Sequence, residues 1–254
     1  MIQSVDRALE ILELFQGGAE SVGITEVAKH LGISKAAAYA LMTTLQKRNF
    51  LKQDQNSRRY KLGFKLLQLG ALFVNQSELG RAAQPWAVNL CNRFGEVVHI
   101  SIFAAEAALI VHRFEPKEPF LLYPQPGSTM PLYSTAGGKV LLAYAPPEIQ
   151  EKFLSQAPFP PKTPNTIVKK SDLLREIKII QKQEYAEDRE ETIIGVACVG
   201  APIRDKSGRV IAAISLTGSK TRMEERGWEE IVKAVKMTAL QISSALGYRM
   251  DMGG

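Results

Sequence analysis

Basic side chains are concentrated in one short stretch of the chain, residues 34–65. This stretch holds eight lysines and arginines against a single acid, Asp54, so its net charge is +7, whereas the whole chain of 254 residues carries +6. The remainder of the chain is therefore close to neutral. Clustered Lys and Arg side chains bind phosphates and release their counterions, which favours an extended polyanion as the partner of this segment. The basic residues are Lys35, Lys47, Arg48, Lys52, Arg58, Arg59, Lys61 and Lys65.

Two helices joined by a tight turn are predicted to position these basic residues, within residues 24–62. Gly32 ends the first helix, because a residue without Cβ adopts the left-handed conformation at little cost, and Ser34 caps the second helix. The apolar face of the first helix consists of Ile24, Val27, Ala28 and Leu31. The buried stripe of the second helix consists of Ala38, Leu41, Met42 and Leu45. Its exposed face then consists of Lys35, Ala36, Tyr39, Ala40 and Thr43.

A short basic hairpin is predicted behind the second helix, with Asn56-Ser57 as its tight turn. Helix pairs joined by glycine also occur in ordinary bundles, and charge runs often only solvate a surface, so the hairpin decides between the alternatives. A helix pair followed by a basic hairpin is typical of a winged helix-turn-helix, which inserts one helix into double-stranded DNA and contacts phosphates with the wing. The predicted DNA contacts are Ser34, Lys35, Ala36, Tyr39, Thr43, Lys52, Arg58 and Arg59.

Composition limits the class of protein. A hydrophobic content of 45% over 254 residues fits two folded domains. Acids and an arginine interrupt the apolar stripe of residues 1–15, which predicts an amphipathic helix and not a signal peptide. No apolar run approaches the ~20 residues needed to cross a bilayer. Cys91 and Cys198 are too few for a disulfide framework, which indicates a reducing cytoplasm. We therefore expect a cytoplasmic protein, and the absence of a long apolar run predicts no membrane partner.

Three segments are predicted along the chain: a winged helix-turn-helix domain over 1–65, a linker helix over 66–80 and a second domain over 81–250. The linker contains no proline and no flexible Gly/Ser tract, and its apolar stripe would pair with a second copy or pack on the next domain. Helices of the second domain are expected at 82–94, 135–145, 172–183 (capped by Ser171) and 222–246. Strands are expected at 97–103, 108–114, 120–123, 185–188, 194–202 and 210–216, with loops at 127–131 and 158–164 and a turn at 205–208. Helices on both sides of an antiparallel sheet define an α+β fold, similar in size to small-molecule sensor modules.

Collinear segments along essentially the whole chain resemble the IclR family of bacterial transcriptional regulators. They are QSVDRALEILELF, ITEVAKHLGISK, RRYKLG, LYSTAGGKVLLAY, YAEDREETIIGVACVGAPI and GRVIAAISLTG. The resemblance implies a linker helix between the winged helix-turn-helix and a GAF-like effector-binding domain. It also implies a transcriptional regulator that senses an organic, sugar or aromatic acid, and we expect a repressor in preference to an activator. It also implies homodimers through the DNA-binding domains and homotetramers through the effector domains. Ala40 stands where many members carry a basic residue, which assigns more of the DNA readout to Lys35, Tyr39 and Thr43.

The resemblance further implies an effector pocket. The matching residues are Ala136, Gly137, Asp188, Cys198, Ser215 and Thr217. Ala136 and Gly137 open a helix, where backbone N–H groups and the positive end of the helix dipole favour an anion. Ser215 and Thr217 lie two positions apart on a strand, so their hydroxyls share one side of the sheet. Strand alternation suggests pocket walls from Ile100, Leu132, Val196 and Ile214.

Other functions have less support in the sequence. The glycines at 137 and 138 do not complete the GxxxxGK[ST] pattern of a phosphate-binding loop. His99, His112, Asp188 and Cys198 lack the spacing of zinc ligands, so no metal or cofactor is expected. Cys198 with either histidine offers a nucleophile and a base but no orienting third group, so we do not expect an enzyme. A DNA-binding protein whose second domain is only an oligomerisation scaffold remains the alternative.

Overall fold

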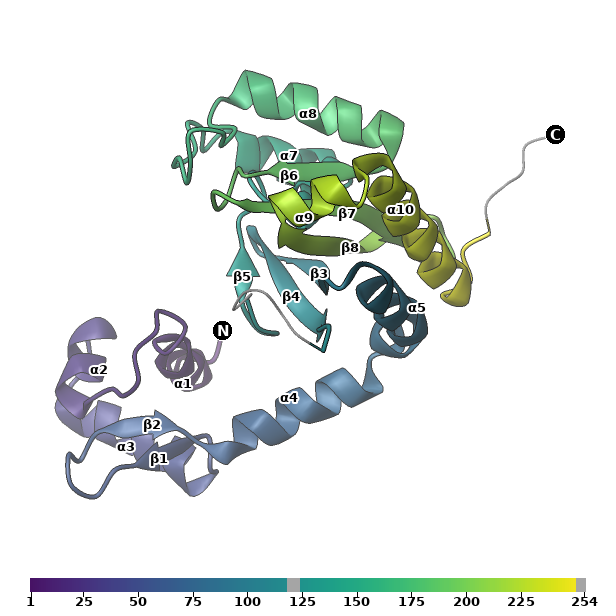
Figure 1. Ribbon diagram of the computed structural model, residues 1–254. Coiled ribbons are helices and arrows are strands. Elements are labelled where there is room, and N and C mark those ends of the chain that lie inside the picture. The colour runs from purple at the N-terminus through teal and green to yellow at the C-terminus, as the bar shows by residue number, and fades with distance from the viewer. Residues whose placement is uncertain (118–123, 250–254) are drawn as a thin grey trace. The chain divides into compact units, whose positions relative to one another are not determined.

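The computed structural model describes residues 1–117 and 124–249, and the chain forms two compact units, Met1–Gln76 and Ser77–Gly254 (Figure 1). The predicted linker of 66–80 corresponds to helix α4 (Phe64–Gln76) and the first turn of α5 (Glu78–Phe94). The helical stretch is interrupted at Ser77, because its hydroxyl accepts a hydrogen bond from Gly80 N (3.0 Å) and caps a new helix. Within the described residues no helix is long and apolar enough to cross a membrane.

The first unit has the predicted three helices and hairpin: α1 (Gln3–Glu13), α2 (Ile24–His30), α3 (Lys35–Lys47), β1 (Leu51–Gln53) and β2 (Tyr60–Leu62). Gly32 has the expected positive φ, +62°, and the Ser34 hydroxyl accepts a hydrogen bond from Ala37 N (3.2 Å). Its core contains the apolar side chains that the helical spacing selected, together with Tyr60 from the hairpin. The turn of the helix-turn-helix therefore arises from local chemistry alone.

The connection between β1 and β2 is longer than the predicted Asn56-Ser57 turn. It spans residues 54–59, and Asp54 Oδ1 accepts hydrogen bonds from Asn56 N (3.1 Å) and Ser57 N (2.8 Å). The backbone of Arg58 is left-handed, with φ +58°. The two-residue turn was wrong because the Asp54 carboxylate organises the loop from its first residue, which adds residues to the connection.

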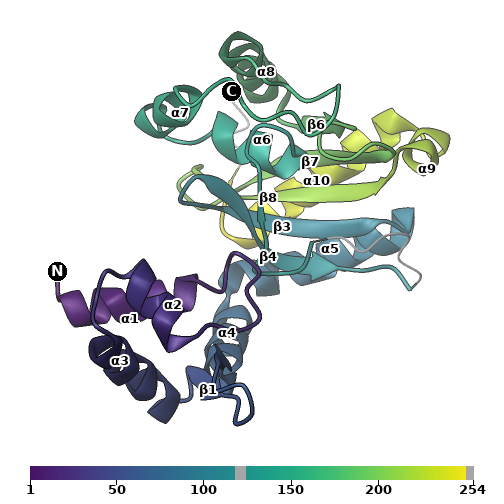
Figure 2. The same cartoon turned by 90° about the vertical axis from the view of Figure 1, so that its left-hand side faces the viewer.

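The second unit is built on one antiparallel sheet of order β5-β4-β3-β8-β7-β6. The strands are β3 (Val97–Ala104), β4 (Ala107–Phe114), β5 (Thr129–Met130), β6 (Ala186–Arg189), β7 (Val196–Arg204) and β8 (Val210–Ser219). Helices α6 (Ala136–Ala143), α7 (Pro147–Leu154) and α8 (Lys170–Gln183) cover one face (Figure 2). Helices α5, α9 (Lys220–Glu225) and α10 (Trp228–Ala245) pack on the other face. The sheet therefore has a separate hydrophobic core on each side.

Several boundaries in this unit differ from the prediction. Helix α7 was not predicted, and the loop expected at 127–131 contains β5, which pairs with β4. The single helix expected at 222–246 is interrupted at Gly227, whose φ of +86° separates α9 from α10. Helix α8 begins at Lys170 after Lys169, so Ser171 lies inside it and does not cap it. The strand predicted at 120–123 lies outside the described residues.

Candidate DNA interface and effector cavity

The exposed face of α3 is the candidate reading surface for DNA. Lys35, Ala36 and Tyr39 are exposed as predicted, Tyr39 to 54%. Thr43 is only half-buried and its hydroxyl oxygen is enclosed, which corrects its predicted outward position. Four residues turn a helix by about 400°, so Thr43 is rotated about 40° from Tyr39 toward the buried stripe. Thr44 is exposed instead, although its hydroxyl donates to Ala40 O (2.8 Å).

The two wing arginines have different surroundings. The guanidinium of Arg59 donates to both carboxylate oxygens of Glu26 (3.0 and 2.9 Å) and to Ser21 Oγ (2.9 Å) and O (2.8 Å). Arg58 and Lys52 are exposed. Hydrogen bonding from Arg59 lowers the pKa of Glu26, as a charged pair requires. Arg59 therefore ties the wing to helix α2, while Arg58 and Lys52 present their charges to the outside.

We predict that the two arginines contribute unequally to the salt dependence of DNA binding. Arg58→Ala should reduce the slope of log K against log salt by about one counterion, because its charge is available to a phosphate. Arg59→Ala should change the slope less and lower the melting temperature of the protein, because its donors already bind Glu26 and Ser21. Fluorescence anisotropy at several salt concentrations measures the slopes. Equal slopes for the two variants would contradict this difference.

Tyr39→Ala should reduce the preference for a specific DNA site more than it reduces non-specific affinity. The side chain is exposed on α3 and has both an aromatic face and a hydroxyl for base edges. A base-specific contact carries ~1–3 kcal/mol of discrimination. Competition binding with specific and scrambled duplexes measures the ratio, and an equal loss for both duplexes would show that Tyr39 does not read bases.

The start of α6 has free backbone donors. Thr135 caps this helix: its hydroxyl accepts from Gly138 N (3.1 Å), and its carbonyl accepts from Lys139 N (2.8 Å). The amides of Ala136 and Gly137 have no acceptor within the described part of the chain. The cap uses Gly138, so two amides, and not three, can bind an anion there.

Strand pairing brings the other predicted residues to the same place. Asp188 pairs with Cys198, and Cys198 pairs with Thr217, so the three side chains form one row across β6, β7 and β8. In the next row Ser215 pairs with Gly200. A Cβ at Gly200 would lie 3.1 Å from Gly137 N, so glycine there lets α6 approach the sheet closely.

All six predicted effector residues line one cavity of ≈ 80 Å³ between α6 and the sheet. They are Ala136, Gly137, Asp188, Cys198, Ser215 and Thr217. The backbone donors of α6 form one wall of this cavity, and the strand hydroxyls form its floor. This combination suits a small ligand with an anionic end and a polar substituent.

Three of the four predicted walls are wrong. Ile100 and Ile214 pack in the core on the α5 and α10 face, and Leu132 packs in the core with α7 and α8. Of the four predicted wall residues, only Val196 lines the cavity. Strand side chains alternate between faces, and the choice of face needs the cross-strand register, which a single sequence does not supply.

The same register identifies cavity residues that the sequence reading missed. His99 and Ser101 of β3 flank Ile100 and face the cavity, and Thr192 contributes from the loop between β6 and β7. A Cβ on Gly137 would lie 3.8 Å from the hydroxyls of both Ser101 and Ser215. The available signal was two polar side chains alternating along an otherwise apolar strand.

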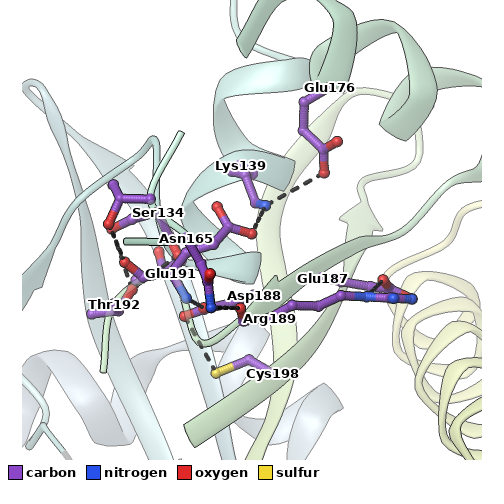
Figure 3. A network of polar contacts seen from close by, with 12 residues as sticks. Ser134, Lys139, Asn165, Glu176, Glu187, Asp188, Arg189, Glu191, Thr192 and Cys198 are labelled. Atoms are coloured by element: carbon purple, nitrogen blue, oxygen red, sulfur yellow. Dashed lines mark hydrogen bonds and ion pairs between the residues drawn. The ribbon is translucent and has the colours of Figure 1, made fainter. Parts of the chain in front are cut away.

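A buried ionic network adjoins the cavity residues Asp188 and Cys198 (Figure 3). The side chain of Lys139 is 1% exposed, and its ammonium binds Glu191 (2.6 Å) and Glu176 (3.4 Å). Asp188 Oδ1 accepts from Glu191 N (2.7 Å), and the Cys198 thiol lies 3.9 Å from Asp188 Oδ2. The network fixes the strand end that carries Asp188 against α6.

Burial sets the charge states of this region. Desolvation raises the pKa of Asp188 and raises that of Glu191 to about 7, although Lys139 opposes the second shift. Burial also raises the pKa of the Cys198 thiol well above its usual range, which keeps it protonated at neutral pH. Among the described residues no group of three His, Cys, Asp or Glu side chains is placed to hold a metal ion.

The two units together define a class of protein: a winged helix-turn-helix joined to an α+β domain with a small cavity. Residues 4–55 match the model of the IclR helix-turn-helix domain, and residues 71–244 match that of the bacterial transcriptional regulator IclR C-terminal domain. The chain belongs to the IclR family of bacterial transcriptional regulators.

Relatives and solved structures agree with this assignment. The HTH-type transcriptional regulator XynR of Escherichia coli K12 is 32% identical over 248 residues, which cover 98% of each chain. The crystal structure of the Thermotoga maritima IclR is 31% identical with a TM-score of 0.72, covering 98% of this chain and 100% of that one. An IclR homologue of Microbacterium hydrocarbonoxydans in complex with 4-hydroxybenzoate shares the fold at 21% identity and a TM-score of 0.81. The match covers 96% of this chain and 98% of that one.

Proposed function

We propose that this protein is a ligand-responsive transcription factor of the bacterial cytoplasm. The first unit binds double-stranded operator DNA, and the second binds a small organic acid and changes operator affinity. Repression is the proposed sign of regulation. The observation that carries this proposal is the convergence of six residues, from α6 and from strands β6, β7 and β8, on one cavity.

The cavity supports an acid as the ligand. The amides of Ala136 and Gly137 would bind the carboxylate, and the hydroxyls of Ser215 and Thr217 would bind a polar substituent. Asp188 would act as an acceptor and disfavour a second carboxylate nearby. The complex of the Microbacterium homologue with 4-hydroxybenzoate supports a small acid as the ligand class.

A symmetric oligomer is part of the proposal. Helix α4 exposes apolar side chains, each 47–76% exposed: Phe64, Leu67, Leu69, Leu72 and Phe73. Such a surface on a soluble helix favours pairing with a second copy of the chain. A homodimer formed in this way would recognise a two-fold operator, and further association through the second units would give a homotetramer. Analytical ultracentrifugation distinguishes the homodimer from the homotetramer.

Regulation then requires two states of the oligomer with different operator affinity. A ligand shifts the equilibrium between these two states only by the difference in its affinity for them. The scaffold alternative predicts that no acid binds the second unit. The two hypotheses differ in thermal unfolding, because a ligand that binds only the folded state must raise the melting temperature.

Operator affinity with and without acids tests the proposal. DNA sites bound by the full-length protein are first mapped, and a mapped duplex is then titrated in the presence of a panel of organic, sugar and aromatic acids. At least one acid should change both the operator affinity and the melting temperature, and a reporter gene then shows whether the DNA-bound protein represses. If no acid changes either quantity, the effector function is wrong and the scaffold alternative holds.

A further inference from the structure

Two alanines occupy the middle of the exposed side of α3. Ala40 lies two positions from each of the buried residues Ala38 and Met42, which is about 200° around the helix, so it lies on the side opposite the core of the first unit. Ala36 lies one turn before Ala40 on the same side, and both residues are exposed. A helix that packs on its domain through one side enters the major groove with the opposite side. The two alanines therefore lie where base edges are expected.

Hydrogen-bonding groups are few on this side of α3. Thr44, one turn after Ala40, is exposed, but its hydroxyl donates to Ala40 O (2.8 Å) and has no second proton for a base. Lys47 is the last residue of the helix, beyond the N-terminal part that contacts bases. Lys35 and Tyr39 are exposed beside the alanines and supply polar contacts. The centre of the reading surface therefore consists of methyl groups.

An alanine methyl group favours thymine over the other bases for two reasons. It neither donates nor accepts a hydrogen bond, so a base amino or carbonyl group that faces it loses water without gaining a partner. Thymine, in contrast, presents a methyl group at C5 in the major groove, and contact between the two methyl groups removes apolar surface from water. Alanines at the centre of the reading surface therefore select thymine.

The surroundings identify this surface as a DNA surface independently of the alanines. Residues 4–55 match the IclR helix-turn-helix domain, and Lys52 and Arg58 of the wing are exposed in the same unit. Phosphate contacts from such side chains hold a protein on any duplex and carry no sequence information. The choice of base is therefore made by α3.

We propose that Ala36 and Ala40 determine operator specificity by packing against the 5-methyl groups of two thymines in each operator half-site. This inference rests on the proposed operator binding and names the bases that α3 selects. One turn separates the alanines by about 6 Å along the helix, so the two thymines should lie within about two base pairs of each other. Burial of one methyl-sized group should contribute about a fourfold factor in affinity.

Binding-site selection with the full-length protein, followed by replacement of single thymines, tests the proposal. The protein first selects duplexes from a random library, and each thymine of a selected duplex is then replaced by uracil, which keeps the base pairing and lacks only the 5-methyl group. Two thymines of each half-site should lose about fourfold affinity on replacement, measured by fluorescence anisotropy. Thymines outside the contacted base pairs are the control and should change little.

Serine variants assign each methyl contact to one alanine. Ala36→Ser and Ala40→Ser each add a hydroxyl group to the methyl carbon, and each should abolish the preference for thymine over uracil at one base pair and keep it at the other. Ala19→Ser is the matched control, because it makes the same change at an exposed residue of the first unit outside α3. It should keep the preference at both base pairs.

The comparison of thymine with uracil uses the wild type and does not depend on the folding of a variant. If the selected duplexes bind equally well with uracil, or if the thymine preference survives in both serine variants, the proposal is overturned and operator binding stands. If selection enriches no sequence, the proposed operator binding fails together with this inference.

Discussion

Replacing Ser215 by alanine and Thr217 by valine together should abolish the response of operator binding to the ligand while ligand-free DNA binding stays unchanged. Both hydroxyls are buried on the floor of the cavity, and both substitutions nearly preserve side-chain volume. Each lost hydrogen bond costs about 0.5–1.5 kcal/mol, so ligand affinity should fall roughly 10- to 100-fold. The DNA-binding residues belong to the first unit and keep their own core. Operator titrations with and without the active acid measure both quantities.

Thr238→Val is the matched control for this double variant. Thr238 is also buried but lies on α10, on the opposite face of the sheet, so its replacement should leave the ligand response intact. A normal response in the Ser215→Ala/Thr217→Val protein would show that the ligand binds elsewhere.

Lys139→Met should destabilise the second unit by ~3–5 kcal/mol at neutral pH, because removing one partner of a buried ion pair leaves the other charge unpaired. The lost ammonium binds Glu191 and Glu176, and the Asp188 carboxylate lies in the same network. Urea denaturation followed by circular dichroism measures the free energy of unfolding. Lys152→Met is the control, since Lys152 pairs with Glu106 on the exposed surface and should cost far less.

The stability should also depend on pH through Glu191. Its pKa rises from 4.5 to about 7 on folding, so between these values the folded state binds more protons than the unfolded state. The contribution of Glu191 to stability therefore increases as pH falls from about 7 toward 4.5. In Lys139→Met this increase should be larger, because the cation that opposes the shift is absent. If Lys139→Met lowers the free energy of unfolding by the same amount at pH 5 and pH 8, this account of the network is contradicted.

Local chemistry made the first unit largely predictable. The apolar spacing of α2 and α3, the turn at Gly32 and the cap at Ser34 all depend on residues within a few positions of one another. The errors there were the hairpin loop, which the Asp54 carboxylate lengthens, and the position of Thr43 on α3. One contact across the unit was not predicted at all. Arg59 binds Glu26 and Ser21, which lie more than thirty positions away, and no local pattern indicates this pairing.

The second unit shows where the sequence was insufficient. Resemblance to a family identified Ala136, Asp188, Cys198 and Ser215 as pocket residues, and the structure brings all of them to one cavity. Alternation along β3 could not decide whether Ile100 or its neighbours face the ligand. A shift of one residue in register exchanges the two faces of a strand, so the prediction selected the core-facing side.

The sequence by itself determined the family, the helix-turn-helix and the concentration of positive charge beside it, because these depend on residue order and composition. Only the tertiary structure decided that His99 and Ser101 face the cavity and that Lys139 binds Glu191 across the domain. Those contacts join segments far apart in the chain through strand pairing and the packing of α6 on the sheet. Their geometry is set by a register and by a close approach at Gly200 that exist only once the whole domain has folded.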